Sequence, residues 1–235
     1  MTRRRTAVVT GASRGIGLAV ARALALRYTV IMTARNAESL GAAAAEIGDD
    51  ACPLSFDLAD MTATKAAIER IRTMSSGAPD VLVNNAGLFK LSPIESTSPD
   101  DFSASLDVNL SAPFRLIRAF LPEMRKRGSG HVLSIGSIAD RMAFPENGSY
   151  AAAKFGLRGL HEVLRAELRG SGIRSTLISP APVDTPLWDE VNPDERKGFT
   201  PRSAMLRPED VAAAVLFAIG QPDSVNVDEL RLSRS

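Results

Sequence analysis

Tyr150 and Lys154 are spaced for proton-transfer chemistry, because they lie four residues apart in an Ala- and Leu-rich stretch with a helical pattern. On a helix, residues at i and i+4 share one face, with Cβ atoms roughly 5–6 Å apart. An ammonium at that distance favours ionisation of a phenol, whose reference pKa is about 10. We therefore expect a tyrosine that acts as a general acid or base near neutral pH. The alternative is a chance pair on a helix surface.

Two other polar residues are candidates for the same site. Ser137 follows the apolar run 131–135, which predicts a buried strand, so its hydroxyl would lie at the carboxyl end of that strand. Ligands bind at this end in open α/β sheets. Asn109 lies between two helical pieces within 99–127, where an asparagine is mildly unfavourable. A structural hydrogen bond would explain Asn109, and so would a role in the site.

A glycine-rich turn follows the β-branched run 6–10 and leads into a helical stretch at 18–27. Glycines let the backbone approach a pyrophosphate, and a helix N-terminus stabilises its charge, so this stretch predicts the start of a dinucleotide-binding βαβ unit. The spacing G-x-x-x-G-x-G differs from the general fingerprint, and a turn without a ligand also uses glycines. The residues assigned to the turn are Gly11, Ser13, Arg14, Gly15, Ile16 and Gly17.

Arg35 follows the second predicted strand, 28–33, where an NAD site usually carries an acidic residue for the ribose 2′-hydroxyl. Together with Arg14 it predicts that NADP is preferred and that NAD is the alternative cofactor, because guanidinium groups bind phosphate in a bidentate way. The alternative is that neither arginine binds a 2′-phosphate. In that case Arg35 points into solvent or pairs with Glu38, and Arg14 pairs with a carboxylate.

Two more strand ends carry candidate cofactor contacts. Asp57 and Leu58 follow the third predicted strand, 51–56, and Asp57 would either accept a hydrogen bond from an adenine amino group or cap the next helix. The fourth predicted strand, 79–83, leads into Asn84, Asn85, Ala86 and Gly87. This sequence suits a turn whose backbone approaches a ligand, although Asx-turn chemistry alone would also explain it.

Six or seven predicted strands alternate with helices, which predicts a parallel sheet with helices on both faces. The length of 235 residues and the 45% hydrophobic content suit one domain spanning residues 1–235. Residues 187–206 are rich in proline and charge, show no helical or strand pattern, and contain Trp188 and Phe199. A long loop of this kind is typical of a lid, and we expect it to contact substrate.

Charge and composition limit the classes of partner that we expect this protein to bind. The net charge is +1, from 28 basic and 27 acidic residues, so we expect neither nucleic acid nor an anionic membrane as a partner. No apolar run approaches the ~18–20 residues of a membrane span. The lone Cys52 cannot form an internal disulfide, and neither histidine belongs to a metal-ligand cluster. We expect a cytoplasmic protein that acts on a small molecule without a metal.

The combined motifs resemble the short-chain dehydrogenase/reductase family in its single-domain branch, including its 3-oxoacyl-[acyl-carrier-protein] reductase-like members. The resemblance covers nearly the whole chain, and the order and spacing of its motifs are specific together. It implies a doubly wound, Rossmann-type α/β fold with seven parallel strands in the order 3-2-1-4-5-6-7, and bound NAD or NADP. The residues that carry it are Thr10, Gly11, Gly15, Ile16, Gly17, Asp57, Asn84, Asn85, Ala86, Gly87, Asn109, Ser137, Tyr150 and Lys154.

The resemblance also implies residue roles. Tyr150 would exchange a proton with the oxygen of a carbonyl or alcohol substrate, and Ser137 would position that oxygen. Lys154 would bind the nicotinamide ribose hydroxyls and lower the pKa of the tyrosine. Asn109 would shape its helix and hold a water that relays protons to the lysine. The cofactor carries the hydride, while the protein supplies orientation and electrostatics.

The segment after the sixth predicted strand, 173–178, departs from the family pattern at one position. The family usually has Pro-Gly where this chain has Pro180 and Ala181, which adds a methyl group near the nicotinamide. Val183 and Thr185 match the positions that contact the nicotinamide carboxamide. Two other functional classes stay open: a redox sensor that binds the cofactor without turnover, and an epimerase or dehydratase, whose members carry a separate substrate domain.

A homo-oligomer, specifically a tetramer with a dimer as the alternative, is expected from the resemblance and from the helices around Asn109 and Tyr150. These helices carry apolar residues on more than one face, so one face would pack on the sheet and another on a symmetry mate. The alternative is a core helix covered by its own chain. The apolar residues are Phe114, Leu116, Phe120, Leu121, Phe155, Leu157, Leu160 and Leu164.

Overall fold

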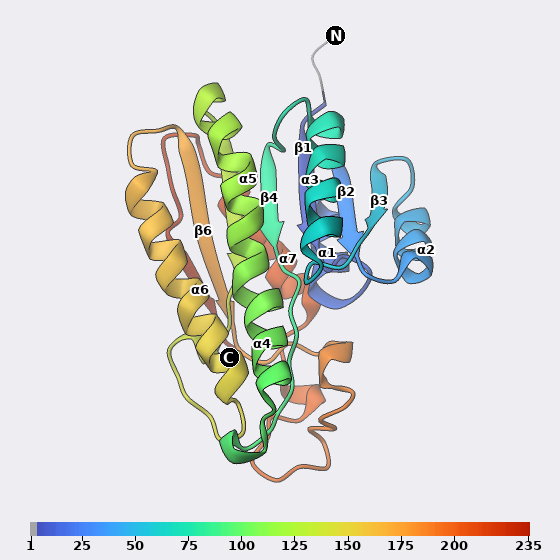
Figure 1. The fold of residues 1–235 in the computed structure, drawn as a ribbon, viewed down its shortest axis with the longest axis vertical. Coiled ribbons are helices and arrows are strands. Elements are labelled where there is room, and N and C mark those ends of the chain that lie inside the picture. Colours follow the sequence, from blue (N-terminus) through green and yellow to red (C-terminus); the bar gives the residue numbers. More distant parts are fainter. Residues whose placement is uncertain (1–3) are drawn as a thin grey trace.

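A seven-stranded parallel sheet forms the centre of the molecule in the computed structural model, which describes residues 4–235 (Figure 1). The strand order is β3-β2-β1-β4-β5-β6-β7, which confirms the predicted doubly wound α/β fold. The chain winds in both directions from β1, so the crevice between β1 and β4 is a topological switch point. The strands are β1 (Thr6–Thr10), β2 (Thr29–Ala34), β3 (Ala51–Ser55), β4 (Val81–Asn84), β5 (Gly130–Ile135), β6 (Ile173–Pro180) and β7 (Glu229–Leu232).

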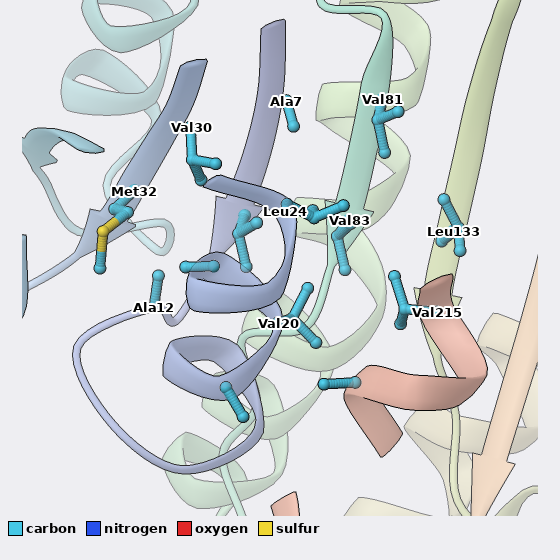
Figure 2. Close-up of a cluster of buried hydrophobic side chains, with 14 of the residues drawn as sticks. Ala7, Ala12, Val20, Leu24, Val30, Met32, Val81, Val83, Leu133 and Val215 are labelled. Atoms are coloured by element: carbon cyan, nitrogen blue, oxygen red, sulfur yellow. The ribbon is translucent and has the colours of Figure 1, made fainter. Parts of the chain in front are cut away.

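Helices cover both faces of this sheet. Successive residues of a strand point to opposite faces, so Val9 packs with the helices of one face and Val8 with those of the other. On the first face, Val20 and Leu24 lie over the central strands, and α1 runs beside α7 (Figure 2). The helices are α1 (Gly15–Ala25), α2 (Ala37–Ile47), α3 (Met61–Ser75), α4 (Pro99–Leu106), α5 (Ala112–Arg127), α6 (Gly148–Glu167) and α7 (Pro208–Ile219).

The last strand is shorter than the sequence predicts. The alternating pattern at 225–232 suggests strand throughout, but only Glu229–Leu232 pairs with β6. Upstream, the Asn226 side chain takes the place of a paired backbone: its Oδ1 accepts from the Ser175 N–H at 2.8 Å, and its Nδ2 donates to the Ser175 carbonyl at 3.0 Å. The backbone of β6 is thus satisfied at this point without a longer strand.

The predicted loop at 187–206 joins β6 to α7 and lies beyond the carboxyl ends of the strands (Figure 1, orange). It contains two short 3₁₀ helices, Pro186–Trp188 and Arg202–Ala204. A parallel bridge between Val183 and Leu206 brings the two ends of the loop together. Within residues 4–235, no helix has the length and apolarity needed to cross a bilayer, and no three metal-binding side chains gather.

Candidate active site

A cavity of about 1120 Å³ opens at the carboxyl ends of the strands. All predicted site residues line it except Asn109. We divide the cavity into two halves that meet at Ser137 and Tyr150. The cofactor half is lined by Gly11, residues 13–17, residues 33–36, Ser39, residues 56–58 and residues 85–87. The substrate half is lined by Phe89, Leu91, residues 144–147, residues 186–188 and residues 196–200.

The glycine turn of the cofactor half is built against the end of β4. Gly11 has a φ of +66°, and a Cβ at Gly17 would lie 2.1 Å from the Gly11 carbonyl oxygen, so both positions require glycine. Asn85 Nδ2 donates to the Thr10 carbonyl at 2.8 Å and to the Gly11 carbonyl at 3.3 Å. The Thr10 hydroxyl accepts from the N–H groups of Asn85 and Ala86, both at 3.0 Å. This explains why Asn85 must be an amide.

The N-terminus of α1 faces the cavity and suits an anion. Arg14 occupies the N-cap position with extended backbone, no side chain caps the helix within the described residues, and its first turn holds no acidic residue. The first-turn N–H groups are thus available to a ligand, and the helix dipole favours negative charge there. The close packing of Gly11 and Gly17 leaves backbone, not side chains, at the cavity wall. The residues present therefore fit the pyrophosphate of a dinucleotide.

The adenosine end of the cofactor half is basic. Arg14 and Arg35 are exposed, and neither forms an ion pair within residues 4–235, so the pairing of Arg35 with Glu38 is not found there. Sequence reasoning missed two neighbours in this half. Asn36 caps α2 by accepting from the Ser39 N–H at 2.8 Å, and both residues line the cavity. The cap signal Asn-x-x-Ser after a strand would have identified them.

Asp57 does not cap the following helix, so that alternative is wrong. Its Oδ1 accepts from the Ala59 N–H at 2.9 Å and closes a local turn. The cap of α3 is Asp60, which accepts from Thr62 and Ala63. Asp60 is three residues closer to the helix and thus has the correct geometry. Asp57 lines the cavity, and a contact with adenine stays a prediction.

Lys154 is buried with 3% of its surface exposed, and its Nζ donates to the Ile135 carbonyl at 2.8 Å. The Nζ lies 5.5 Å from the centre of the Tyr150 ring. Burial lowers the pKa of Lys154 to about 8, while the nearby charge of Asp140 raises it. A base with this pKa still carries its proton through most of the neutral range. The residue that the i and i+4 spacing predicted beside the phenol is thus a buried, mostly charged ammonium.

The expected lowering of the tyrosine pKa is not found. Burial by the surrounding protein raises the pKa of Tyr150 to about 12, the Ser137 hydroxyl lowers it, and the charge of Asp140 raises it. Desolvation disfavours the charged phenolate, and here it outweighs the other influences. The Lys154 ammonium points to a backbone carbonyl instead of to the phenolic oxygen. In this structure Tyr150 is therefore a protonated group at neutral pH.

Ser137 lies just beyond the end of β5, as the sequence predicts. Its Oγ accepts from the Ala139 N–H at 3.1 Å and starts a short 3₁₀ helix, Ile138–Asp140. This backbone contact fixes the position of the hydroxyl beside Tyr150. Because a hydroxyl still has a proton to donate after accepting one bond, Ser137 remains able to donate to a ligand oxygen.

Asp140, which the sequence analysis did not identify, is fully buried behind this serine. Its carboxylate accepts a hydrogen bond from the Ser179 hydroxyl and pairs with the Arg141 guanidinium at 2.7 Å. Arg141 also forms an ion pair with Glu229 of β7. The network joins the catalytic-site loop to the last two strands of the sheet. No local sequence pattern predicts it, because its members are up to 89 residues apart (229 − 140).

Asn109 lies in a π-helical stretch, Asp107–Ser111, between α4 and α5. The side chain is 1% exposed; its Nδ2 donates to the Leu88 and Ser105 carbonyls at 2.8 and 2.9 Å, and its Oδ1 accepts from the Leu88 N–H at 3.2 Å. Asn109 thus holds the segment after β4 against the helix, which agrees with the structural reading. π-Helical stretches often occur at functional sites, and the proton-relay role stays a prediction.

Ala181, the departure from the family pattern, is accommodated without strain. Its N–H donates to the Leu232 carbonyl at 2.8 Å, and its φ is outside the left-handed region that favours glycine. Pro180, Val183 and Thr185 line the cavity beside it. Alanine therefore fits this position with ordinary backbone geometry.

Aromatic side chains dominate the substrate half. The Phe89 ring lies edge-on to the Tyr150 ring and to the Trp188 ring, with 5.0 Å between centroids in both pairs. The Trp188 and Phe199 centroids are 6.4 Å apart. Arg196 stacks on the Phe199 ring at 4.8 Å and forms an ion pair with Glu146 at 2.7 Å. The sequence analysis did not identify Phe89, although it follows Gly87 by only two residues.

Comparison with known proteins decides the family. The family model described as short chain dehydrogenase matches residues 5–196. The chain belongs to the short-chain dehydrogenase/reductase family. It is 36% identical over 221 residues to D-threitol dehydrogenase of Mycolicibacterium smegmatis, covering 91% of this chain and 85% of that protein. It is 35% identical over 249 residues to 17-beta-hydroxysteroid dehydrogenase type 1 of Homo sapiens, covering 93% and 75%.

A solved structure agrees with this assignment. A metagenomic short-chain oxidoreductase in complex with NADP superimposes with a TM-score of 0.84 at 34% identity, covering 98% of this chain and 97% of that one. The protein is therefore an NAD(P)-dependent oxidoreductase of the short-chain dehydrogenase/reductase family, and an enzyme.

Proposed function

We propose that this family member transfers hydride between NADP(H) and a carbonyl or secondary alcohol, with Tyr150 as general acid and base. The observation that supports this most directly is the convergence of Ser137, Tyr150 and Lys154 where the two halves of the cavity meet. The cofactor half fits a dinucleotide, and the substrate half lies on the other side of the tyrosine. A substrate carbonyl placed between them would contact both a proton donor and the cofactor.

The roles follow from the geometry and the pKa values. Burial holds the pKa of Tyr150 at about 12, so the hydroxyl carries a proton at neutral pH that it can donate to a carbonyl oxygen during reduction. Ser137 would donate a hydrogen bond to the same oxygen. Lys154 would bind the ribose hydroxyls and supply the positive charge that stabilises the phenolate left by proton transfer. Asn109 holds the adjoining helix, and bound NADPH supplies the hydride.

The preference for NADP is supported by charge. Arg14 and Arg35 lie exposed at the adenosine end without ion-pair partners within residues 4–235, and Thr33 and Ala34 offer no carboxylate that would repel a 2′-phosphate. The metagenomic relative binds NADP. Among the cofactor contacts we include Asp57, Leu58, Ala86 and Gly87, which line the adjoining wall. Their roles remain those that the family resemblance implies.

Replacement of Tyr150 by phenylalanine tests the proposal, because the variant loses only the hydroxyl. We expect NADPH-dependent turnover of a carbonyl substrate to fall by about 10²–10⁴-fold. The dissociation constant for NADPH should stay within about threefold of wild type, since the ring remains in place. Wild-type turnover in the variant would contradict the acid–base role, whereas binding of NADPH without turnover by the wild type would favour a redox sensor.

We also propose a homo-oligomer, specifically a tetramer. The helices predicted to be apolar on more than one face divide as expected: Phe120 and Leu157 are fully buried, whereas Phe114 and Phe155 are 49% and 45% exposed. Large exposed rings on two helices suit contact with another copy of the chain. Light scattering at micromolar concentration checks this, and a monomer would contradict it. The single domain, the cytoplasmic location and the small-molecule partner likewise stay predictions.

A further inference from the structure

Four aromatic rings form a row through the substrate half, and we call Tyr150, Phe89, Trp188 and Phe199 the aromatic row. They come from three segments: α6, the chain after β4, and the loop between β6 and α7. The row begins at the residue that carries the proton. A substrate that approaches Tyr150 from this half therefore meets aromatic surface beside the tyrosine.

The row is fixed in place by contacts other than ring packing. Trp188 Nε1 donates to the Val183 carbonyl at 3.1 Å, and Val183 is itself buried. At the outer end, Arg196 holds the Phe199 ring and is in turn held by Glu146. Aromatic surface that is already positioned loses little conformational entropy when a ligand binds. The row is thus a preformed wall.

The charge of the substrate half is largely compensated. Glu146 and Arg196 pair with each other, which leaves the exposed Lys197 as the other charged side chain among the lining residues of this half. A polyhydroxylated substrate needs several polar partners, because a buried hydroxyl without one costs free energy. Apolar residues form most of the wall, and its polar members besides these three are Asn147 and Thr200. Its apolar members besides the row are Leu91, Phe144, Pro145, Pro186 and Leu187.

From this geometry we infer that the preferred substrate is a carbonyl compound whose carbonyl carbon is attached directly to an aromatic ring, such as an aryl ketone or an aromatic aldehyde. The Phe89 ring centroid lies 5.0 Å from that of Tyr150, so an aryl group that packs on Phe89 from the cavity side lies next to the tyrosine, and only a carbonyl attached directly to that aryl group stays close to it. Aromatic pairs favour edge-to-face or offset stacking, which such a substrate provides. This inference rests on the proposed function of the site.

A substrate comparison tests the inference with acetophenone, butanone and erythrulose as the aryl, alkyl and polyhydroxylated ketones. We expect kcat/KM with NADPH to be at least about tenfold higher for acetophenone than for the other two. A preference for butanone or erythrulose would overturn the inference and leave the proposed function standing. Failure to reduce any carbonyl compound, including benzaldehyde, would overturn both.

Variants at Phe89 separate stacking from positioning of the tyrosine. Phe89→Leu keeps an apolar side chain but removes the ring, and should lower kcat/KM for acetophenone about 3- to 10-fold more than it lowers kcat/KM for butanone. The matched variant Phe89→Tyr keeps the ring and should retain the preference. Equal losses for both ketones in Phe89→Leu would mean that Phe89 acts only through Tyr150, which would overturn the inference.

Binding gives a readout that does not need turnover. Trp188 is the one tryptophan of the chain, so its fluorescence reports on the aromatic row alone. With NADP⁺ bound, acetophenone should quench this fluorescence in a saturable way, and erythrulose at the same concentrations should not. Absence of saturable quenching by acetophenone in the folded wild-type protein would overturn the inference even if the Phe89 variants failed to fold.

Discussion

The two halves of the cavity differ in what forms their walls, which is mainly backbone in one half and side chains in the other. The cofactor half is made largely of backbone: the positive φ of Gly11, the contact of Gly17 with the Gly11 carbonyl, and the bonds of Asn85 to main-chain oxygens. The substrate half is made of side chains, in the aromatic row and the Glu146–Arg196 pair. A site made of backbone suits a ligand group that many proteins bind, such as the pyrophosphate of a dinucleotide. Side chains that line a substrate site can change from one protein to another without altering the fold.

The largest effect should come from adding one methyl group to the cofactor half. In Gly17→Ala the new Cβ would lie 2.1 Å from the Gly11 carbonyl oxygen and 2.5 Å from Asn85 Nδ2. Overpacking usually costs ~1–3 kcal/mol, and overlap with backbone places this case at the upper end. We expect the dissociation constant for NADPH, measured by fluorescence titration, to rise about 100-fold.

Gly41→Ala is the matched control for this variant. A Cβ at Gly41 in α2 meets no atom within 4 Å, and alanine favours helix over glycine. Its NADPH affinity should equal that of wild type, and its midpoint of thermal unfolding should not fall. If Gly17→Ala also binds NADPH normally, the cofactor half is not the rigid backbone site that the comparison assumes.

The next effect tests a side chain within the backbone-built half. Arg35→Asp replaces a guanidinium by a carboxylate that would repel a 2′-phosphate and accept from a 2′-hydroxyl. A hydrogen bond to a charged group contributes roughly 1.5–3 kcal/mol, so the ratio of kcat/KM for NADPH over NADH should fall about 10- to 100-fold. Arg27→Asp makes the same charge reversal just before β2, at the other end of the strand that Arg35 follows, and should leave the ratio unchanged. If this ratio does not change in Arg35→Asp, Arg35 does not bind the 2′-phosphate.

Lowering the pH should destabilise both halves of the cavity to the same extent, and this is the smallest of the three effects. His131 and His161 are buried outside both halves, and desolvation lowers their pKa values to about 3 and about 4. The charge of Arg174 lowers the pKa of His131 further. For His161, a backbone hydrogen bond with Ser175 and the charge of Asp228 raise the pKa, while Arg165 lowers it. Below pH 6.5 the unfolded chain binds protons that the folded protein does not. The contribution of these neutral histidines to the free energy of unfolding is therefore fully present above about pH 6.5 and is lost as the pH falls towards their folded-state pKa values.

Lowering the pH from 7.5 to 6 should reduce the free energy of unfolding by roughly 1–2 kcal/mol for the two histidines together. Urea unfolding at both pH values measures this, with far-ultraviolet circular dichroism for the sheet and Trp188 fluorescence for the substrate half. Both signals should move to lower urea by the same amount. A shift of the fluorescence signal alone would show that the substrate half unfolds separately, and no shift would contradict the role of the histidines.

Much of the fold was predictable because its signals are local. The helix α2 is an example, because the capping residue Asn36 before it and Gly48 after it mark both of its ends. The helix α7 is another, because Pro208 stands at its first position, where proline suits a helix. The last strand was predicted too long, since the bond between Asn226 and the β6 backbone depends on a residue far away in the chain.

The candidate site divides in the same way. The glycine turn and the pair of Tyr150 and Lys154 depend on spacing within one segment, so the sequence indicates them. Glu146 and Arg196 are 50 residues apart, and only the folded chain brings them together. The pKa of Tyr150 was misjudged because sequence shows a neighbouring charge but not the loss of water around the phenol, which is the larger influence here.

The ion pair between Arg141 and Glu229 has a consequence for synthesis on the ribosome. Arg141 holds the buried Asp140 behind Ser137, and its second partner lies in the last strand of the sheet. During translation, the site of proton transfer therefore stays incomplete until residues 229–232 have emerged and paired with β6. A nascent chain that already contains the glycine turn, Ser137 and Tyr150 still lacks the support for its catalytic loop.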